Sequence, residues 1–488
     1  MPLPFTRQLA RRWLRRAALV AIIAQPLHVQ AQQPPPATFD VVIANGRVMD
    51  PESRLDAARH VGIIENRIRA VSETPLQGRV TLDATGLVVA PGFIDLHAHG
   101  QSAENYRLQA LDGVTSALEL EVGTEDVDAW YAAREGTALI NYGVSVGHIR
   151  ARMVVMNDPG PGLLPSGSGA TAPATPEQIE RMKQVLERGL QRGAVAVGFG
   201  PTYTPAATRW EILEMFRVAA KYGASAHIHV RGNADTLVGF EEAIAAAAVT
   251  GAPVHIVHIN SVSTSATPRT LQLVAEAQAR KLDVTAEAYP YTAGMTEIQS
   301  ALFGDWESRP ADWFGQLQWV STGERLTRET FQRYRQVGGM VILHNNTEEM
   351  VRLAIASPLT MIASDGHVEG GKGHPRTAGT YARVLGRYVR EQRALDLMSA
   401  IRKMAYLPAR RLEYRVPSMR DKGRIKVGAE ADVVVFDPAA VMDRATYQEP
   451  ALPSVGMRHV LVQGVPVVRD GKLDESRMPG RPVRGIVR

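Results

Sequence analysis

The chain has 488 residues, of which 45% are hydrophobic and none is cysteine. This length allows a barrel-sized domain with a smaller unit beside it, and the lack of cysteine excludes disulfides, thiolate ligands and thiol nucleophiles. The net charge of +5 comes from five arginines in residues 1–31, which hold no acidic residue. The rest of the chain is balanced and has no basic stripe, so the composition does not indicate nucleic-acid binding.

Residues 1–31 have the features of an export signal. A basic segment that contains Arg11 and Arg12 precedes an apolar run at 17–24, which is too short to span a bilayer. The sequence Val-Gln-Ala at 29–31 fits a cleavage site, and a proline-rich linker follows at 32–38. We therefore expect an exported, periplasmic protein without a stable membrane span. The arginine pair leaves both the general and the twin-arginine export routes open.

Residues 39–90 alternate apolar and polar side chains like β-strands. The first strand is expected to turn at Asn45-Gly46, and the residues after the turn are expected to form the second strand of a hairpin. A second hairpin is expected around Glu65-Asn66. This part of the chain is therefore predicted to be a small β unit.

The C-terminal residues 416–488 show the same alternation, at 423–438 and again at 459–473. Two β-rich ends of similar character favour one shared unit over two separate ones. The pattern predicts a small β-sandwich subdomain formed by both ends, with residues 91–415 inserted between its two parts.

Residues 91–415 alternate short apolar strands with amphipathic helices. Strands are expected at 193–200, 223–230, 253–260 and 282–291, and helices at 209–222, 239–251 and 268–281. Repeated βα units predict a parallel sheet, and their total length favours a closed (β/α)8 TIM-like barrel. Functional groups of such a barrel lie at the carboxyl ends of the strands.

Two long segments interrupt this alternation. Residues 157–177 are rich in proline and glycine and are expected to form a long loop. Residues 296–340 carry Trp306, Trp313 and Trp319 and are expected to form an elaborated loop or a lid. We expect these tryptophans to pack within the lid rather than contact a substrate.

Polar residues follow several of the apolar strands. His97 and His99 are one residue apart, so they share a face of a strand and can grip one metal ion. Further candidates at successive strand ends are Glu119, Glu121, His227, His229, His255, His258 and Asp365. This ordered set predicts a binuclear metal site of a hydrolase, with Asp365 as general base and then acid. His227 is expected to be a buried supporting histidine, and His344 a structural one.

Several longer motifs carry a family resemblance. They are PGFIDLHAHG at 91–100, GVTSALELEVG at 113–123, EAYPYTAG at 287–294 and HPRTAGTYARVLGRYVRE at 374–391. Through them the chain resembles the amidohydrolase superfamily and, within it, the N-acyl-D-amino-acid deacylases, especially their D-glutamate deacylase branch. The resemblance runs through nearly the whole chain after the linker. It implies hydrolysis of a small N-acyl amino acid, N-acyl-D-glutamate among the candidates, with one or two Zn2+ or other divalent ions.

The resemblance also implies roles for individual residues. They are His97 and His99 as ligands of one metal, His229 and His258 as ligands of the other, Asp365 as catalytic acid/base and possible ligand, and Arg376 with Tyr289 as the holders of the substrate α-carboxylate. A forked guanidinium suits a carboxylate, so the role of Arg376 is physically sensible. Tyr203 is expected either to line the pocket or to pack. Oligomeric state is not predicted.

Three departures from the family pattern affect these expectations. The related deacylases bridge their metals with a cysteine, and this chain has none, so a carboxylate must replace it; Glu121 is favoured over Glu119. The first histidine motif continues as Gly100-Gln101, where relatives carry acidic residues. Asn260 stands where relatives carry a lysine that contacts substrate, so Asn260 is expected to contact the substrate without the positive charge.

Other functions remain open at this point. A cyclic-amide hydrolase of the dihydroorotase or hydantoinase type would bridge its metals with a carboxylated lysine, and no lysine ends a suitable strand. A dipeptidase would use similar chemistry on another amide. A non-catalytic metal- or ligand-binding protein is disfavoured because Asp365 is intact.

Overall fold

The computed structural model describes residues 38–160, 162–232 and 235–487. The expected signal peptide and the linker up to residue 37 lie outside the described residues. Residues from Thr38 onward form one compact unit. Within the described residues, every helix is too short or too polar to cross a membrane.

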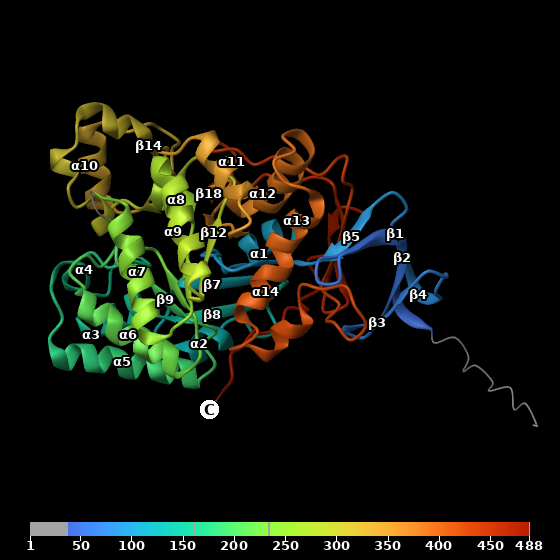
Figure 1. Cartoon of the computed structure of the whole chain (residues 1–488). Helices are drawn as coiled ribbons and strands as arrows, with labels where there is room; N and C mark the ends of the chain where they lie inside the picture. The colour runs from blue at the N-terminus through green and yellow to red at the C-terminus, as the bar shows by residue number, and fades with distance from the viewer. Residues whose placement is uncertain (1–37, 161, 233–234, 488) are drawn as a thin grey trace, which may run out of the picture. The chain divides into compact units, whose positions relative to one another are not determined.

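Eight parallel strands form the centre of the molecule (Figure 1). In chain order they are β6 (Phe93–Asp95), β7 (Val114–Thr124), β8 (Asn141–Gly147), β9 (Val197–Phe199), β10 (Ala226–Ile228), β11 (Val254–Ile256), β12 (Val284–Ala288) and β16 (Thr360–Ile362). Each strand pairs with its neighbour, and the ring is nearly closed between β16 and β6. The (β/α)8 barrel expected from the sequence is therefore confirmed.

Helices surround the barrel and bury its outer face. They include α1 (Ala103–Leu111), α2 (Val127–Ala132), α3 (His148–Val155), α4 (Ser168–Thr171), α5 (Pro176–Gln191), α6 (Arg209–Lys221), α7 (Leu237–Thr250), α8 (Ile259–Ser263), α9 (Thr267–Ala279), α11 (Glu348–Ala356), α12 (Arg376–Arg383), α13 (Leu397–Ile401) and α14 (Leu407–Leu412). The expected helices at 209–222, 239–251 and 268–281 correspond to α6, α7 and α9. Apolar residues at helical spacing, such as Ile212 and Phe216 of α6, are fully buried against the strands.

Both chain ends contribute to one nine-stranded sheet beside the barrel (Figure 1). Its strands are β1 (Phe39–Asp50), β2 (Leu55–Ile64), β3 (Arg67–Ser72), β4 (Gly78–Asp83), β5 (Val88–Pro91), β19 (Val433–Phe436), β20 (Met457–Val462), β21 (Val465–Arg469) and β22 (Lys472–Leu473). The link between the ends is the antiparallel pair β5–β19. Residues of both ends share one apolar core, for example Val41, Leu82, Val433 and Leu461.

One expected turn in this sheet was wrong. The strand does not reverse at Asn45-Gly46, because β1 continues through these residues and pairs with β2 on both sides of them. The register shifts between Ile43 and Gly46, so Ala44 and Asn45 form a bulge opposite His60, and Asn45 has a φ of 62°. The expected hairpin at Glu65-Asn66 is confirmed by the β2–β3 pairing.

An insertion at residues 294–343 forms a small unit with its own core. It contains β13 (Gly294–Glu297), β14 (Leu317–Trp319), β15 (Met340–Leu343) and α10 (Arg328–Val337), with short 3-10 turns η2 (Ala301–Phe303), η3 (Trp306–Ser308) and η4 (Ala311–Gln316). Trp319 is buried in this core, and Trp306 and Trp313 pack against it. The three tryptophans thus pack within the insertion, as expected.

Candidate metal centre

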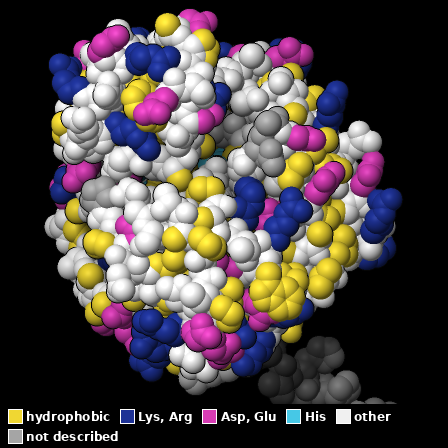
Figure 2. Space-filling model, turned by 90° about the vertical axis from the view of Figure 1, so that its left-hand side faces the viewer, with side chains coloured by type: hydrophobic (Ala, Val, Ile, Leu, Met, Phe, Trp, Pro, Cys, Tyr) yellow, Lys and Arg dark blue, Asp and Glu magenta, His cyan; other side chains and the backbone are white. Residues whose placement is uncertain are grey.

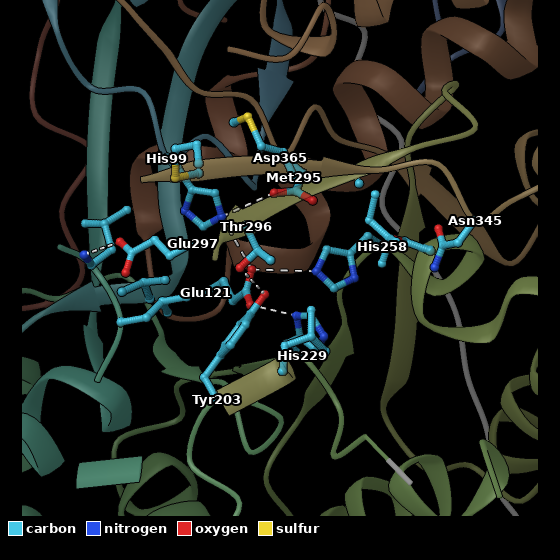
Figure 3. A pocket seen from close by; sticks show the side chains of 18 residues that line it. His99, Glu121, Tyr203, His229, His258, Met295, Thr296, Glu297, Asn345 and Asp365 are labelled. Atoms are coloured by element: carbon cyan, nitrogen blue, oxygen red, sulfur yellow. Dashed lines mark hydrogen bonds and ion pairs between the residues drawn. The ribbon is translucent and has the colours of Figure 1, made fainter. Parts of the chain in front are cut away.

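The barrel brings the predicted ligands to one end. His97 and His99 follow β6, Glu121 lies near the end of β7, and His229, His258 and Asp365 follow β10, β11 and β16. Because parallel strands end at the same rim, side chains from distant parts of the sequence meet there (Figure 3).

Hydrogen bonds close the barrel directly beneath the site. One carboxylate oxygen of Asp95 accepts the backbone N–H groups of His97, at 3.1 Å, and of Ser364, at 3.0 Å. The backbone N–H of Asp365 donates to the carbonyl oxygen of His97 at 2.6 Å. These bonds join the first and last strands, so they fix His97 and Asp365 relative to one another.

A first group of candidate ligands consists of His97, His99, Glu121 and Asp365, whose ligand atoms lie within 4.8 Å of one another. His97 Nε2 lies 2.6 Å from a carboxylate oxygen of Glu121 and 3.1 Å from His99 Nε2. Asp365 Oδ1 lies 3.2 Å from His99 Nε2. Four donor atoms therefore converge on one small volume, as a metal ion requires.

A second group consists of Glu121, His229 and His258. Glu121 Oε1 lies 3.1 Å from His229 Nδ1, and its other oxygen lies 3.7 Å from His258 Nε2 (Figure 3). Glu121 belongs to both groups, so it has the position of a carboxylate shared by two ions.

The charges around the histidines favour a bound cation. Burial lowers the pKa of the His97 imidazole, but three nearby carboxylates raise this pKa well above its usual range. These carboxylates belong to Asp365, Glu121 and Glu287. The same balance raises the pKa of His99. The centre thus calls for positive charge, which a divalent ion supplies while leaving the imidazoles neutral and able to ligate; imidazole and carboxylate donors together fit such an ion.

Two further carboxylates orient the first histidine pair. His99 Nδ1 bonds to Glu119 at 2.6 Å, and His97 Nδ1 bonds to Glu287 at 2.7 Å. Each bond leaves the Nε2 atom of its imidazole directed at the metal position. Glu119 therefore supports a ligand rather than bridging. Glu287 was not predicted from the sequence, although it begins the motif EAYPYTAG two residues before Tyr289.

The backbone is strained at two site residues. His258 has a φ of 34° and Asp365 a φ of 54°, both in the left-handed region that non-glycine residues rarely occupy. Such conformations cost about 1–3 kcal/mol each and persist where the surrounding structure enforces them. Here they direct two side chains back over the end of the barrel.

Arg376 lies behind Asp365 and is 1% exposed. Its Nη1 is 2.9 Å from Asp365 Oδ2, and its guanidinium stacks 4.7 Å from the centre of the Tyr289 ring. The Arg376 Nε is buried without a hydrogen-bond partner. Asn260 is also fully buried, and its side-chain amide donates to the carbonyl oxygen of Tyr289 at 3.1 Å. Asn260 therefore lies behind Tyr289. Of the four residues predicted to bind substrate, Tyr203 lines the cavity over the ligand groups, whereas Asn260, Arg376 and Tyr289 are outside its described lining.

A cavity opens over the two ligand groups, and histidine is visible deep in a hollow of this face (Figure 2). Tyr203 lines it, with its ring 4.9 Å from that of His229. Much of the remaining wall is apolar and comes from the 157–177 loop and the insertion, through Leu163, Leu164, Met295, Leu302, Met340 and Leu343. Glu297 of the insertion joins these two segments, because it accepts the Leu163 N–H at 2.6 Å. Burial raises the pKa of Glu297.

The other two predicted supporting histidines also have defined places. His227 is fully buried and contacts the Ser225 hydroxyl at 3.0 Å, so it is a supporting residue of the barrel interior. His344 contacts the Gln318 side chain at 3.0 Å within the insertion, which agrees with a structural role.

Known proteins resemble this chain over most of its length. The profile described as "Amidohydrolase family" matches residues 80–145 and 170–468. The chain is 32% identical to N-acyl-D-glutamate deacylase of Alcaligenes xylosoxydans xylosoxydans, over 91% of this chain and 96% of that protein. It is 30% identical to D-aminoacylase of the same organism, over 88% of this chain and 94% of that protein.

A solved structure shows the same arrangement of the chain. N-acyl-D-glutamate deacylase of Bordetella bronchiseptica, complexed with zinc and a phosphonate inhibitor, matches with a TM-score of 0.78 and 28% identity, over 92% of this chain and 100% of that one. The resemblance to the deacylases is thereby confirmed. With this barrel, this ligand cluster and these relatives, the chain belongs to the amidohydrolase family.

Proposed function

We propose that the protein is a zinc-dependent deacylase that hydrolyses an N-acyl amino acid, of D configuration, to a carboxylate and the free amino acid. The observation that carries this proposal is the position of Glu121 between two pairs of histidines at the base of a cavity. The relatives named N-acyl-D-glutamate deacylase and D-aminoacylase support the choice of reaction.

The proposed zinc ligands are those predicted from the sequence: His97, His99, Glu121, His229, His258 and Asp365. Imidazole nitrogens and carboxylate oxygens are ordinary zinc donors, and the excess of carboxylates matches a dication. When bound, zinc supplies a water of lowered pKa and a Lewis acid for the amide carbonyl. Glu119 and Glu287 hold the first histidine pair in its ligating orientation.

Asp365 is the proposed general base and acid. Its Oδ1 faces His99 Nε2 and its Oδ2 faces Arg376, so the carboxylate lies between the metal position and the proposed substrate site. It can take a proton from the attacking water and pass it to the departing nitrogen. Burial acts to raise the pKa of the Asp365 carboxyl. Arg376 and the nearby histidines outweigh burial, so the net effect is a pKa well below the usual range. The carboxylate is therefore ionised and ready to accept the proton.

Arg376 and Tyr289 are the proposed holders of the substrate α-carboxylate; both lie behind Asp365, outside the described lining of the cavity. The Arg376 Nε has no hydrogen-bond partner, and a buried donor of this kind is costly unless something binds it. Tyr289 stacks on the guanidinium and limits its movement. Burial raises the pKa of Tyr203 well above its usual range, so its hydroxyl stays protonated and can donate to a substrate oxygen.

The cavity wall favours an apolar group on the substrate. Among the described residues that line it there is no lysine or arginine, and the one carboxylate outside the ligand groups is Glu297. The acidic side chain of a glutamate substrate would face the carboxyl group of Glu297, whose pKa is raised, and the side chains of leucine and methionine residues. We therefore expect substrates with apolar side chains to be preferred over N-acyl-D-glutamate.

The decisive experiment measures amine release by the zinc-reconstituted protein from matched N-acetyl-D- and N-acetyl-L-amino acids, including leucine, methionine and glutamate. We expect turnover of D-substrates that is abolished by chelation and restored by zinc. Asp365→Asn should reduce kcat by about 100-fold or more with an unchanged circular dichroism spectrum. Silence on the whole panel with zinc bound, or full activity of Asp365→Asn, would contradict the proposal.

The cyclic-amide alternative has no support at this centre. Among the described residues that line the cavity or belong to the ligand groups there is no lysine that could be carboxylated, and Glu121 has the shared position. Dihydroorotate and hydantoin are therefore expected to be inert, and they serve as controls in the same panel.

We also propose that the protein is exported to the periplasm. The support is the sequence of residues 1–31, with its basic start, apolar run and Val-Gln-Ala end. N-terminal sequencing of the protein from the periplasmic fraction should give a start at or near Gln32, and an uncleaved cytoplasmic protein would refute the proposal.

A further inference from the structure

A second cavity lies at the opposite end of the barrel from the metal centre. It opens where the strands β10, β11 and β12 begin, and Ser225, Pro253 and Thr285 line it there. Its other wall is formed by residues 402–415, which include the π-helical η6 (Arg402–Tyr406) and helix α14. This cavity is therefore separate from the proposed catalytic site.

The lining of this cavity is strongly positive. Its described residues include Arg402, Arg410, Arg411 and Arg415, and Asp283 is the one acidic residue among them. Arg410 is paired with Glu413 at 3.0 Å, and the Arg415 guanidinium donates to the backbone carbonyl oxygen of Ala194 at 3.3 Å. The excess of positive charge attracts anions to this end of the barrel.

Arg411 is the buried residue of this group. Its side chain is only 4% exposed, and one nitrogen, Nη1, contacts Asp283. Its Nε and Nη2 atoms are buried and have no hydrogen-bond partner. A charged guanidinium that loses water without gaining partners is expensive, so an unsatisfied edge of this kind points to a ligand.

The chain itself shows what such an edge binds. Arg231 uses its Nε and Nη2 atoms to hold both oxygens of Glu242, at 2.8 and 3.0 Å. Arg47 holds Asp56 with the same two atoms, at 2.6 and 2.8 Å. Nε and Nη2 form the side of the guanidinium that matches two oxygens of a carboxylate or a phosphate. In Arg411 this side has no such partner.

We propose that the cavity at the amino-terminal end of the barrel is a binding site for a small oxyanion, a phosphate or a carboxylate, held by the Nε–Nη2 edge of Arg411, which is closed to the cavity in this structure and turns toward it on binding. Arg402 and Arg410 at the exposed rim add attraction. The hydroxyls of Ser225 and Thr285 lie on the barrel side of the cavity. The Asp283 side chain, which is 61% exposed, holds the Nη1 atom of Arg411, so it competes with the anion by fixing the guanidinium, and it releases Arg411 when it turns toward solvent.

Calorimetric titration of the zinc-loaded protein at constant ionic strength tests this site, with inorganic phosphate in one series and acetate in another. We expect saturable binding of at least one of them, weakened at least tenfold by Arg411→Lys, which keeps the charge and loses the fork. Asp283→Asn removes the competitor and should tighten the same binding severalfold. Comparison of the phosphate series with the acetate series shows whether the site binds a phosphate or a carboxylate.

Neither Arg411 nor Asp283 lines the cavity over the metal centre, so an anion that binds in that cavity should make no contact with either substituted side chain. Arg192→Gln, a substitution of an exposed arginine outside the cavity, is the control and should leave the titration unchanged. If Arg411→Lys does not fold, Asp283→Asn still decides the question. No saturable binding of either anion, or binding that the variants leave unchanged, would overturn the proposal.

Discussion

Two glutamates separated by one residue have different surroundings in this centre. The Glu121 carboxylate contacts histidines from three strands, whereas Glu119 contacts His99 and the backbone N–H of Val122, at 3.0 Å. Their side chains have the same chemistry, so their positions alone divide the roles between ligand and support.

Glutamine substitutions should separate these two roles. In Glu121→Gln the shared ligand loses its charge, so we expect fewer zinc ions per chain by elemental analysis after dialysis. Glu119→Gln keeps all ligands and loses only the orientation of His99, so it should retain the metal content and weaken affinity about 10–100-fold. Equal metal loss in both variants would mean that Glu119 is itself a ligand and does not only orient His99.

The sequence predicts the residues of the two candidate ligand groups but not all of the side chains that support them. His97, His99, His229, His258 and Asp365 could be predicted because each follows an apolar strand, and strand ends converge in a barrel. Glu287 was not predicted because it lies inside the buried strand β12 and not after its end. Its partners, His97 and His255, belong to other strands of the barrel or follow them. Contacts of this kind depend on barrel register, which no local pattern specifies.

At the scale of elements, close approach of strands positions the shared carboxylate. An added methyl group at Gly198 of β9 would lie 2.1 Å from the Glu121 carbonyl oxygen, and one at Gly147 would lie 1.8 Å from the Val122 carbonyl oxygen. Both distances are shorter than any tolerated contact. The glycines thus let the end of β7 turn inward over the barrel.

Gly198→Ala should therefore displace the backbone of Glu121 and disturb the metal centre without changing any candidate ligand. The strand must shift away from Glu121, which we expect to lower the free energy of unfolding by about 1–3 kcal/mol and to weaken zinc binding. Gly315→Ala, at a position with open space around it, is the matched control. Urea unfolding and zinc titration measure the two effects. Wild-type affinity in Gly198→Ala would show that this packing does not position the ligand.

The Asn45-Gly46 pair shows where local patterns fail for elements. The dipeptide is a strong hairpin signal, yet here Asn45 lies in a bulge and Gly46 continues the strand. The reason is that β1 has partners along its whole length: β2 throughout, β4 beside its first half and β5 beside its second. One of those partners, β5, connects to strands from the other end of the chain. The turn could not be excluded from the nearby sequence alone.

The insertion should respond to acid through His344. Burial, with a smaller effect of Arg325, lowers the pKa of His344 from 6.5 to about 4. Unfolded chains bind the proton first as pH falls, so stability from neutral His344 is complete above about pH 6.5 and is lost toward pH 4. His344→Gln keeps a donor for Gln318 and should flatten this part of the pH–stability curve. If the stability of the wild type and of His344→Gln changed in parallel between pH 6.5 and 4, the assignment of this pH dependence to His344 would be wrong.

At the scale of the whole molecule, buried polar contacts tie the barrel to the two chain ends. Asn141 of β8 donates to Asp432 at 2.9 Å, and Lys422 lies 2.6 Å from both Asp432 and Glu430. Arg67 of the N-terminal part pairs with Asp421 at 2.7 Å. The β subdomain is therefore held to the barrel by a charged network as well as by its apolar core.

Lys422 is the residue on which this network depends, since its side chain is 4% exposed and compensates two buried carboxylates. Lys422→Met removes the cation and leaves both carboxylates without it, so we expect the free energy of unfolding to fall by about 3–5 kcal/mol. Lys426→Met is the matched control: its side chain is 47% exposed and pairs with Glu52, and an exposed pair contributes about 0–1 kcal/mol. Denaturant unfolding of both variants gives the comparison. Because the network joins distant parts of the chain, Lys422→Met should lower the midpoint of a single transition. A separate early transition of the β subdomain, or equal effects of the two substitutions, would contradict this view of how the chain ends are held.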